Sequence, residues 1–420
     1  MAGVPSAAVD HYKRMQALQV LGIAAARRSW KRVSPARIRD SWAEAVDEYV
    51  DVLGGLQYRA AAAGSSYGAM SVAQSSGVYR PPVGFVDPAG FVGFAPSGAP
   101  LRAAAQSPAI GALVLIGGGV RPVDAVGSAL KQLERLTRTA IADAGRTAAH
   151  ADLASRSGVG YVRMVNPPAC DRCVLLAGRF YRWNNGFLRH PNCDCVHVPS
   201  TKQAVDAAGV EGLVLDPDAY FDSLSEAEQD RVFGRANAAA IREGADMGRV
   251  INARRGMSKN GQRTTALTGG RRGRGEYFAE RGGRLTPEGI FAQAGSREDA
   301  VSLLKEHGYM RYRADGSGAP LLVSVDPKGR DYEGFGQMGR GGTRRGYRQA
   351  VEEAWRTGVS NEGTLTAAER RVDAARLRYE AVLDGRNPYS SKRPLTPELS
   401  AQIEEEYRYW LNRGGQIHTR

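Results

Sequence analysis

Cysteine is scarce in this chain of 420 residues, and its four cysteines all lie in one short segment. They are Cys170, Cys173, Cys193 and Cys195. Small secreted domains that depend on disulfides distribute many cysteines along the chain, and proteins of the reducing cytoplasm do not. The distribution therefore predicts a protein made in a reducing cytoplasm, with the chemistry of its cysteines confined to one place.

Long apolar runs are also missing. The most apolar stretch, from Ala109 to Ile116, is too short to span a bilayer and ends at Gly117-Gly-Gly119. Basic and polar residues interrupt the apolar ones near the N-terminus, where no secretory signal is visible. We therefore expect a soluble protein without membrane contact.

Catalytic motifs are equally scarce. The one Gly-x-Ser-x-Gly string, Gly64-Ser-Ser-Tyr-Gly68, follows an alanine run rather than a strand, so it lacks the context of a nucleophile elbow. No His-Glu-x-x-His motif occurs, and His11 and His150 are expected to be surface or core residues of helices. The sequence assigns no catalytic or cofactor-binding residue and favours binding over catalysis, with a protease as the enzymatic alternative.

The cysteines that are present have the spacing of zinc ligands. Cys170-Asp-Arg-Cys173 and Cys193-Asp-Cys195 flank a segment with strand-forming residues and the turn signal Asn184-Asn-Gly186. A hairpin there would bring the two pairs together around one ion, with His190 as a spare or substitute ligand. His197 is a competing ligand, although its place in an alternating run is typical of a strand surface residue. Reduced buried thiols, and disulfide or redox chemistry, remain alternatives.

The residues around the cysteines resemble the MuF-like head morphogenesis proteins of tailed bacteriophages. The resemblance rests on Ala169-Cys-x-x-Cys-x-x-Leu-Ala-Gly178, on His190-Pro-x-Cys-x-Cys195 and on Tyr220-Phe-Asp-Ser-Leu-Ser-Glu-Ala-Glu-Gln229, and it covers about residues 125–255. The chain has Asp194 where many members carry arginine, which preserves the ligand spacing and changes the local charge.

The resemblance implies a function in the phage head. Members are minor capsid proteins carried next to the portal, so the implied partners are the portal protein and inner capsid, coat or scaffold proteins. The implied location is the virion, after assembly in the host cytoplasm. Relatives from phages of actinobacteria are often labelled capsid maturation protease, which is a rival hypothesis. A zinc-hairpin nucleic-acid regulator is a third possibility, although no recognition helix follows the cysteines at the spacing of a zinc finger.

The charge balance is basic. Lys and Arg number 57 against 44 Asp and Glu, which gives a net charge of +13 and favours contact with a polyanion such as packaged DNA. A glycine-rich segment after residue 253 concentrates this charge in Arg254, Arg255, Arg271, Arg272 and Arg274. DNA contact there would be non-specific and salt-dependent. The alternative is a charged linker that does not fold.

Helical and strand periodicities predict an α+β protein. Ile38, Trp42, Val46, Tyr49 and Leu53 share one helix face, and Tyr161 to Val165 alternate as a strand. We expect five parts: an N-terminal helical region (1–75), a Gly/Pro-rich, partly extended connection (76–122), a central α+β domain (123–255) with the cysteine hairpin at 166–200, a basic Gly-rich linker (256–285), and a mostly helical C-terminal extension with Gly-rich loops (286–420).

Overall fold

The computed structural model describes residues 4–164, 170–185, 195–213, 217–242, 247, 251, 290, 294–306, 310–312 and 367–413. The chain forms two compact units, one of residues 1–76 and 86–310 and the other of residues 77–85 and 311–420. Unit 1 contains helices and an antiparallel sheet, and the described part of unit 2 is mainly helical. The predicted α+β class is confirmed.

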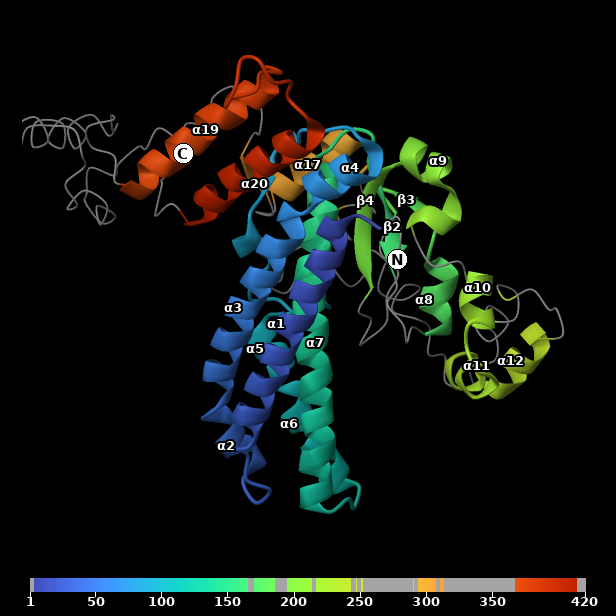
Figure 1. The fold of residues 1–420 in the computed structure, drawn as a ribbon. Helices are drawn as coiled ribbons and strands as arrows, with labels where there is room; N and C mark the ends of the chain where they lie inside the picture. Colours follow the sequence, from blue (N-terminus) through green and yellow to red (C-terminus); the bar gives the residue numbers. More distant parts are fainter. Residues whose placement is uncertain are drawn as a thin grey trace, which may run out of the picture. The chain divides into compact units, whose positions relative to one another are not determined.

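Three long helices form the body of unit 1: α1 (Ser6–Trp30), α3 (Val46–Ser66) and α7 (Pro122–Ala154), which lie side by side in Figure 1. The short helices α2 (Ile38–Ala43) and α4 (Gly68–Ser76) precede and follow α3. A Cβ atom on Gly64 would lie 2.1 Å from the carbonyl oxygen of Gly145. The close approach of α3 and α7 therefore requires glycine at position 64.

The predicted apolar face from Ile38 to Leu53 is confirmed, and all five of its residues are buried. The face continues across α2 and α3, which are separate helices. Trp42 stacks edge-on against Trp30 and donates a hydrogen bond of 2.9 Å from Nε1 to the carbonyl of Ala105. Tyr49 shares a hydrogen bond of 2.8 Å with Thr137 on α7, and burial raises its pKa to about 12. Large aromatic residues thus fill the core and also satisfy their polar atoms.

The segment between the helical regions is more regular than the sequence predicted. After the short strand β1 (Phe85–Val86) and the 3-10 helix η1 (Pro88–Phe91), two helices follow, α5 (Leu101–Ala105) and α6 (Ser107–Gly117). The prediction of a partly extended connection is wrong for residues 101–117. Pro100 is the N-cap of α5 and Pro108 lies in the first turn of α6, where a helix needs no amide hydrogen from proline.

The sheet of unit 1 has three antiparallel strands in the order β3-β2-β4. They are β2 (Val159–Met164), β3 (Phe180–Arg182) and β4 (Val196–Thr201). Tyr161 on the central strand is opposite Tyr181 on one side and Pro199 on the other. The strand predicted at Tyr161 is confirmed, and the described strands β3 and β4 both pair with β2. The second arm of the predicted cysteine hairpin, which would follow the turn at Asn184-Asn-Gly186, lies outside the described residues.

Short helices complete unit 1. They are α8 (Asp171–Leu176), α9 (Lys202–Leu213), α10 (Pro217–Asp222), α11 (Glu226–Phe233), α12 (Arg235–Arg242) and α17 (Arg297–Glu306). The capping box at Ser225 and Glu228 expected from the sequence is present at the start of α11. Ala300, Val301 and Leu304 of α17 lie in the same core as the long helices. Unit 1 therefore includes residues on both sides of the basic segment and ends at β5 (Met310–Tyr312), whereas the sequence-based division falls at residue 286.

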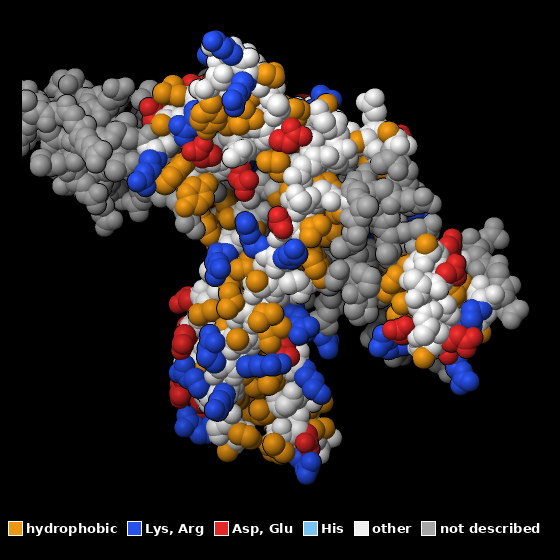
Figure 2. All heavy atoms as spheres, viewed as in Figure 1, with side chains coloured by type: hydrophobic (Ala, Val, Ile, Leu, Met, Phe, Trp, Pro, Cys, Tyr) orange, Lys and Arg blue, Asp and Glu red, His pale blue; other side chains and the backbone are white. Residues whose placement is uncertain are grey.

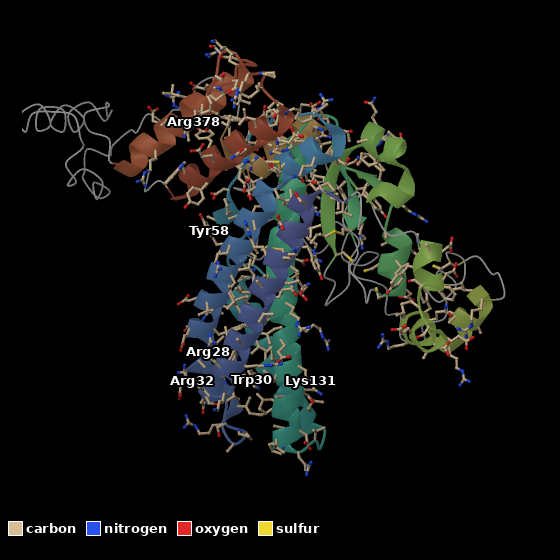
Figure 3. All side chains as sticks on the ribbon, viewed as in Figure 1. Arg28, Trp30, Arg32, Tyr58, Lys131 and Arg378 are labelled. Carbon is tan, nitrogen blue, oxygen red and sulfur yellow. The ribbon has the colours of Figure 1, made fainter. Side chains whose placement is uncertain are left out.

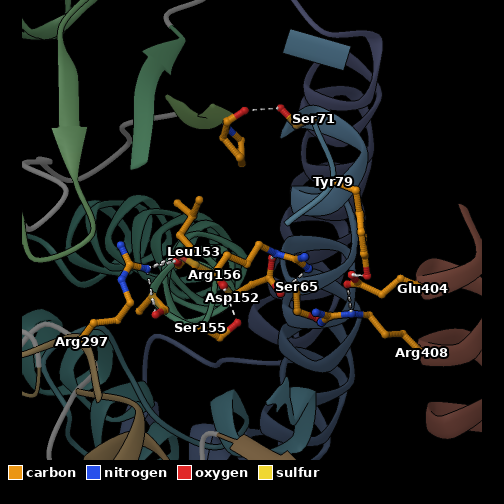
Figure 4. Close-up of polar contacts among 12 residues, drawn as sticks. Ser65, Ser71, Tyr79, Asp152, Leu153, Ser155, Arg156, Arg297, Glu404 and Arg408 are labelled. Carbon is orange, nitrogen blue, oxygen red and sulfur yellow. Dashed lines mark hydrogen bonds and ion pairs between the residues drawn. The ribbon is translucent and has the colours of Figure 1, made fainter. Parts of the chain in front are cut away.

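Unit 2 is built around α19 (Ala367–Leu383) and α20 (Pro397–Arg413). Its core also contains Phe85, whose ring lies 5.7 Å from that of Tyr379 and 5.5 Å from that of Tyr407. The Tyr79 hydroxyl donates to the buried Glu404 carboxylate at 2.7 Å, as Figure 4 shows. On the surface, Arg378, labelled in Figure 3, pairs with Glu406 at 2.6 Å. An early segment of the chain is thus an integral part of the C-terminal unit.

Candidate functional site

The cysteines of the first predicted ligand pair lie at the start of α8. Cys170 is its N-cap, and its Sγ accepts a hydrogen bond of 3.4 Å from the backbone N–H of Cys173. Cys173 and Cys195 are buried and Cys170 is half-buried. The other two predicted ligands, Cys193 and His190, lie outside the described residues.

Two donors near the first pair would stabilise deprotonated sulfur. The Cys173 N–H points to Cys170 Sγ, and Arg163 Nη1 lies 4.0 Å from Cys173 Sγ. Positive charge and N–H donors favour the thiolate over the thiol, and the thiolate is the form of cysteine that binds metals. The chemistry of this pair therefore suits a zinc ligand.

Cys173 and Cys195 approach the same end of the central strand. Cys173 contacts Arg163, and Cys195 immediately precedes Val196, which is paired with Met164. Among the described residues no group of three or more His, Cys, Asp or Glu side chains is arranged to hold a metal, but Cys193 and His190 do not belong to that set. The structure thus brings the two cysteine-bearing arms to one end of β2, without testing the complete ligand set.

Three histidines are buried between the helices and the sheet. The ring of His197 on β4 lies 5.4 Å from that of His150 on α7 and 4.2 Å from that of Tyr161 on β2. His11 on α1 stacks on Tyr67 at 4.0 Å. The expectation of a surface position for His197 is wrong, because every residue of β4 is buried. His150 Nε2 is hydrogen-bonded to the carbonyl of Trp183, next to β3.

Burial keeps His11 and His197 neutral. It lowers the pKa of His11 to about 3, with a further contribution from the Arg14 charge. Burial also lowers the pKa of His197 well below its usual value, followed by the effects of His150 and Arg163. A neutral imidazole avoids a further positive charge beside the buried arginines.

The low pKa of His11 predicts acid sensitivity. The unfolded chain binds a proton at this residue below about pH 6.5, whereas the folded protein does so only near pH 3. The free energy of unfolding should therefore fall as the pH is lowered from 7 to 4, by at most about 1.4 kcal/mol per pH unit for each such histidine. In His11→Phe, denaturant unfolding at several pH values should show a weaker dependence. Tyr12→Phe is the control, and an unchanged slope in His11→Phe would contradict the assignment.

Two ion pairs with aspartates of α7 are buried beside the histidines. Arg156, two residues after the end of α7, binds both carboxylate oxygens of Asp152, at 2.9 and 3.0 Å, and both side chains are completely buried. Asp143 and Arg146, both on α7, form the second pair at 2.8 Å. Arg146 also donates to the carbonyl of Cys195 at 3.3 Å. A buried charge needs such a partner, so the ion pairs fix α7 against the cysteine-bearing arm.

The end of α3 and the helix α4 hold β4 in place. The Tyr67 hydroxyl donates to the carbonyl of His197 at 2.9 Å, and Ser71 Oγ donates to the carbonyl of Pro199 at 2.9 Å (Figure 4). β4 is an edge strand, where proline is tolerated. The hydroxyl groups thus satisfy carbonyls of the strand that follows Cys195.

Arg297 at the start of α17 caps the end of α7. Its Nη1 donates to the carbonyls of Leu153 and Ala154 at 2.9 and 3.0 Å, and also to that of Arg156, as drawn in Figure 4. Its Nη2 donates to the carbonyl of Val159 at 3.2 Å, and the guanidinium lies over the ring of Trp183. The last carbonyls of a helix have no partner within it, and here a residue distant in sequence supplies one.

Replacing Arg297 with alanine should destabilise unit 1 by about 2–3 kcal/mol, because several carbonyls would lose a charged donor. Arg297→Lys should be intermediate, because an ammonium group cannot reproduce the planar geometry of a guanidinium. Lys305→Ala, an exposed position on the same helix, is the control. Urea unfolding measures the effect. Equal stability of Arg297→Ala and Lys305→Ala would refute the capping role.

The serine string considered as a nucleophile has a packing role. Gly64, Ser65 and Ser66 are the last residues of α3, where the hydroxyls of Ser65 and Ser66 donate to carbonyls of the preceding turn. The nucleophile elbow of hydrolases is instead a turn from strand to helix. Within the described ranges, no helix combines the length and apolar character needed to cross a membrane.

The arginines predicted to contact DNA, namely Arg254, Arg255, Arg271, Arg272 and Arg274, lie outside the described residues. His197 was predicted only as a competing zinc ligand, and His11, His150 and the ion pairs were not predicted as part of the site. The signal for the ion pairs in the sequence is the spacing of three or four residues from Asp143 to Arg146 and from Asp152 to Arg156, which is typical of helical ion pairs.

Comparison with known proteins gives one match. The model of a family described as VG15 protein matches residues 115–227, a segment that runs from the end of α6 through α7, the sheet and the cysteines into α11. The match supports a phage protein. No curated protein and no solved structure matches the chain.

Proposed function

We propose that this chain is a minor capsid protein that acts at the portal and inner capsid during head morphogenesis. The observation that supports it best is the place of the family match. Residues 115–227 include the four cysteines, the two buried ion pairs of α7, and His150 and His197. The part that resembles a phage protein is therefore also the part with the densest buried polar interactions.

The arrangement of this part suits a structural role better than catalysis. The guanidinium groups of Arg146 and Arg156 bind carboxylates of α7, and Tyr67 and Ser71 bind backbone carbonyls of β4. Bonds of this kind hold elements together. A rigid binding module that joins other head proteins is the function that these contacts favour.

A zinc ion bound by Cys170, Cys173, Cys193 and Cys195 belongs to the same proposal, with His190 as the substitute ligand. The donors around Cys170 and Cys173 fit thiolate ligands. A site with four protein ligands leaves no position for a reacting water, so its contribution would be to fold the segment between β2 and β4. The partners would be the portal protein and inner capsid, coat or scaffold proteins, and the location the virion. The basic segment would add non-specific contact with packaged DNA.

Co-expression with the portal and coat proteins tests this proposal. We expect the chain to co-purify with assembled particles, the coat protein to remain uncut, and metal analysis to find about one zinc per chain. Coat or scaffold that is processed, and no longer processed when one Ser or His of this chain is replaced, would favour the maturation protease. Tight DNA binding without association with particles would favour the nucleic-acid regulator.

A further inference from the structure

Helix α6 exposes its large aliphatic residues and buries its small ones, which is unusual for a helix that packs only against the core of its own chain. It buries Pro108, Ala109 and Ala112 against the bundle and exposes Ile110, Leu113 and Val114. Ile110 is 58% exposed and Val114 68% exposed. A helix stabilised only by its own core would bury its large aliphatic residues and expose its alanines.

The exposed residues follow the spacing of a helix-packing ridge. The residues that follow Ile110 by three, four and seven positions are Leu113, Val114 and Gly117, so all four lie along one face of the helix. Gly117 also permits the close approach of another backbone at the end of this ridge. The docking face of α6, defined as these four residues, thus has the pattern by which a groove or helix recognises an amphipathic helix.

Basic residues without ion-pair partners lie near this face. A Cβ on Gly111 would lie 2.9 Å from Gln132 of α7, which places α6 beside Lys131 and Arg135. Figure 3 shows Arg28 and Lys131 on the same half of the bundle, and Figure 2 shows Lys and Arg side chains beside apolar ones on the visible face of that half. Among the described residues of this half, no ion pair includes any of these exposed cations: Arg28, Lys31, Arg39, Lys131, Arg135 and Arg138.

The acidic residues of the same half are mostly neutralised. Ion pairs with arginine include all of them except Asp51, namely Asp40, Glu44, Asp47, Glu48, Asp124 and Glu134. Among the described residues, the excess charge on this half of the bundle is therefore positive, and Lys131 and Arg135, which flank Gln132, bring part of it beside α6. A complementary partner carries carboxylates beside its apolar residues.

We infer that the docking face of α6 binds an α-helix of another head protein, one with an aliphatic ridge flanked by acidic side chains. The inference rests on the proposed function, and it names the surface through which this chain would be held in the particle. The exposed large apolar residues of α6 are all aliphatic, without the Trp or Tyr that membrane-surface helices use as anchors. DNA would use the cations but not the ridge.

A charge placed on the ridge tests the inference. Val114→Asp should reduce incorporation into particles at least about tenfold in the co-expression experiment, because the carboxylate would be buried in an apolar interface next to acidic residues. Val20→Asp is the matched control, since Val20 is also a valine in the middle of a helix and 65% exposed. Lys131→Glu, compared with the exposed Lys13→Glu, tests the charge requirement in the same way. Circular dichroism and thermal melting should be unchanged in all four variants.

Each other outcome has a definite meaning. If the wild-type chain is absent from particles, the proposed function is wrong and the inference falls with it. If the wild type is incorporated and Val114→Asp is incorporated equally, or Val20→Asp is lost equally, the function stands and the docking face is refuted. Sedimentation that shows self-association abolished by Val114→Asp would assign the face to a second copy. Flotation with phosphatidylglycerol vesicles that is abolished by Val114→Asp would assign it to a membrane. Either of these results would overturn the inference.

Discussion

Replacing Cys170 or Cys173 with serine should abolish binding of the proposed zinc and unfold the segment between β2 and β4. Structural zinc sites contribute on the order of 10 kcal/mol of folding free energy, and a serine hydroxyl is a poor substitute for a thiolate ligand. We expect about one zinc per chain in the wild type and none in either variant. The unfolded segment would expose the buried His197 and the elements around it, so particle incorporation should be lost as well.

Metal exchange separates ligation from packing. A strong chelator applied to the wild type should reproduce the instability of Cys170→Ser, and added zinc should restore the wild type but not the variant. Thermal melting and metal analysis of the same samples give the answer. If Cys170→Ser kept wild-type stability and assembled normally, the structural zinc would be ruled out, and reduced buried thiols would explain the cysteines.

Breaking the ion pair between Asp152 and Arg156 should have the second large effect. Arg156→Met would remove the guanidinium that binds both oxygens of the completely buried Asp152 carboxylate. Removal of one partner from a buried pair costs about 3–5 kcal/mol. Urea unfolding of the variant should therefore show a loss of this size, and Asp152→Asn should show a smaller one because the amide oxygen can still accept a hydrogen bond.

The double variant Asp152→Asn with Arg156→Met should be less destabilised than the sum of the two single variants, since neither charge is then left alone. Arg121→Met is the matched control, because Arg121 pairs with Asp124 near the start of the same helix but in solvent. We expect no measurable loss there. Similar stabilities for Arg156→Met and Arg121→Met would contradict a buried, structural ion pair.

Local signals in the sequence predicted much of the fold. The face from Ile38 to Leu53, the strand at Tyr161 and the capping box at Ser225 all depend on neighbouring residues, and the structure confirms each of them. Helices α5 and α6 were missed because prolines and glycines were interpreted as interruptions. Pro100 and Pro108 instead lie at helix starts, where they are compatible with helical structure.

The site was less predictable because its contacts join distant parts of the chain. The cysteine spacing is visible in the sequence. The burial of His197 is not, because it results from the packing of α1, α4 and α7 on β4, which no local sequence pattern predicts. Arg297 binds the last carbonyls of α7, Leu153 and Ala154, from 144 and 143 residues away. Tertiary contacts of this kind bury histidine and arginine side chains that the sequence pattern alone predicts to be exposed.

The composition of unit 2 limits when it can form during protein synthesis. Tyr79 and Phe85 leave the ribosome long before their partners Glu404, Tyr379 and Tyr407, since Glu404 follows Tyr79 by 325 residues. Until α19 and α20 have been synthesised, these aromatic side chains cannot be buried in the core of unit 2, and they remain accessible to chaperones or to incorrect partners. A nonsense mutation before α19 would therefore remove α19 and α20 and would also leave residues 77–85 without the elements against which they pack. Conversely, a single cut between residues 313 and 366 would leave the early strand of unit 2 attached to unit 1.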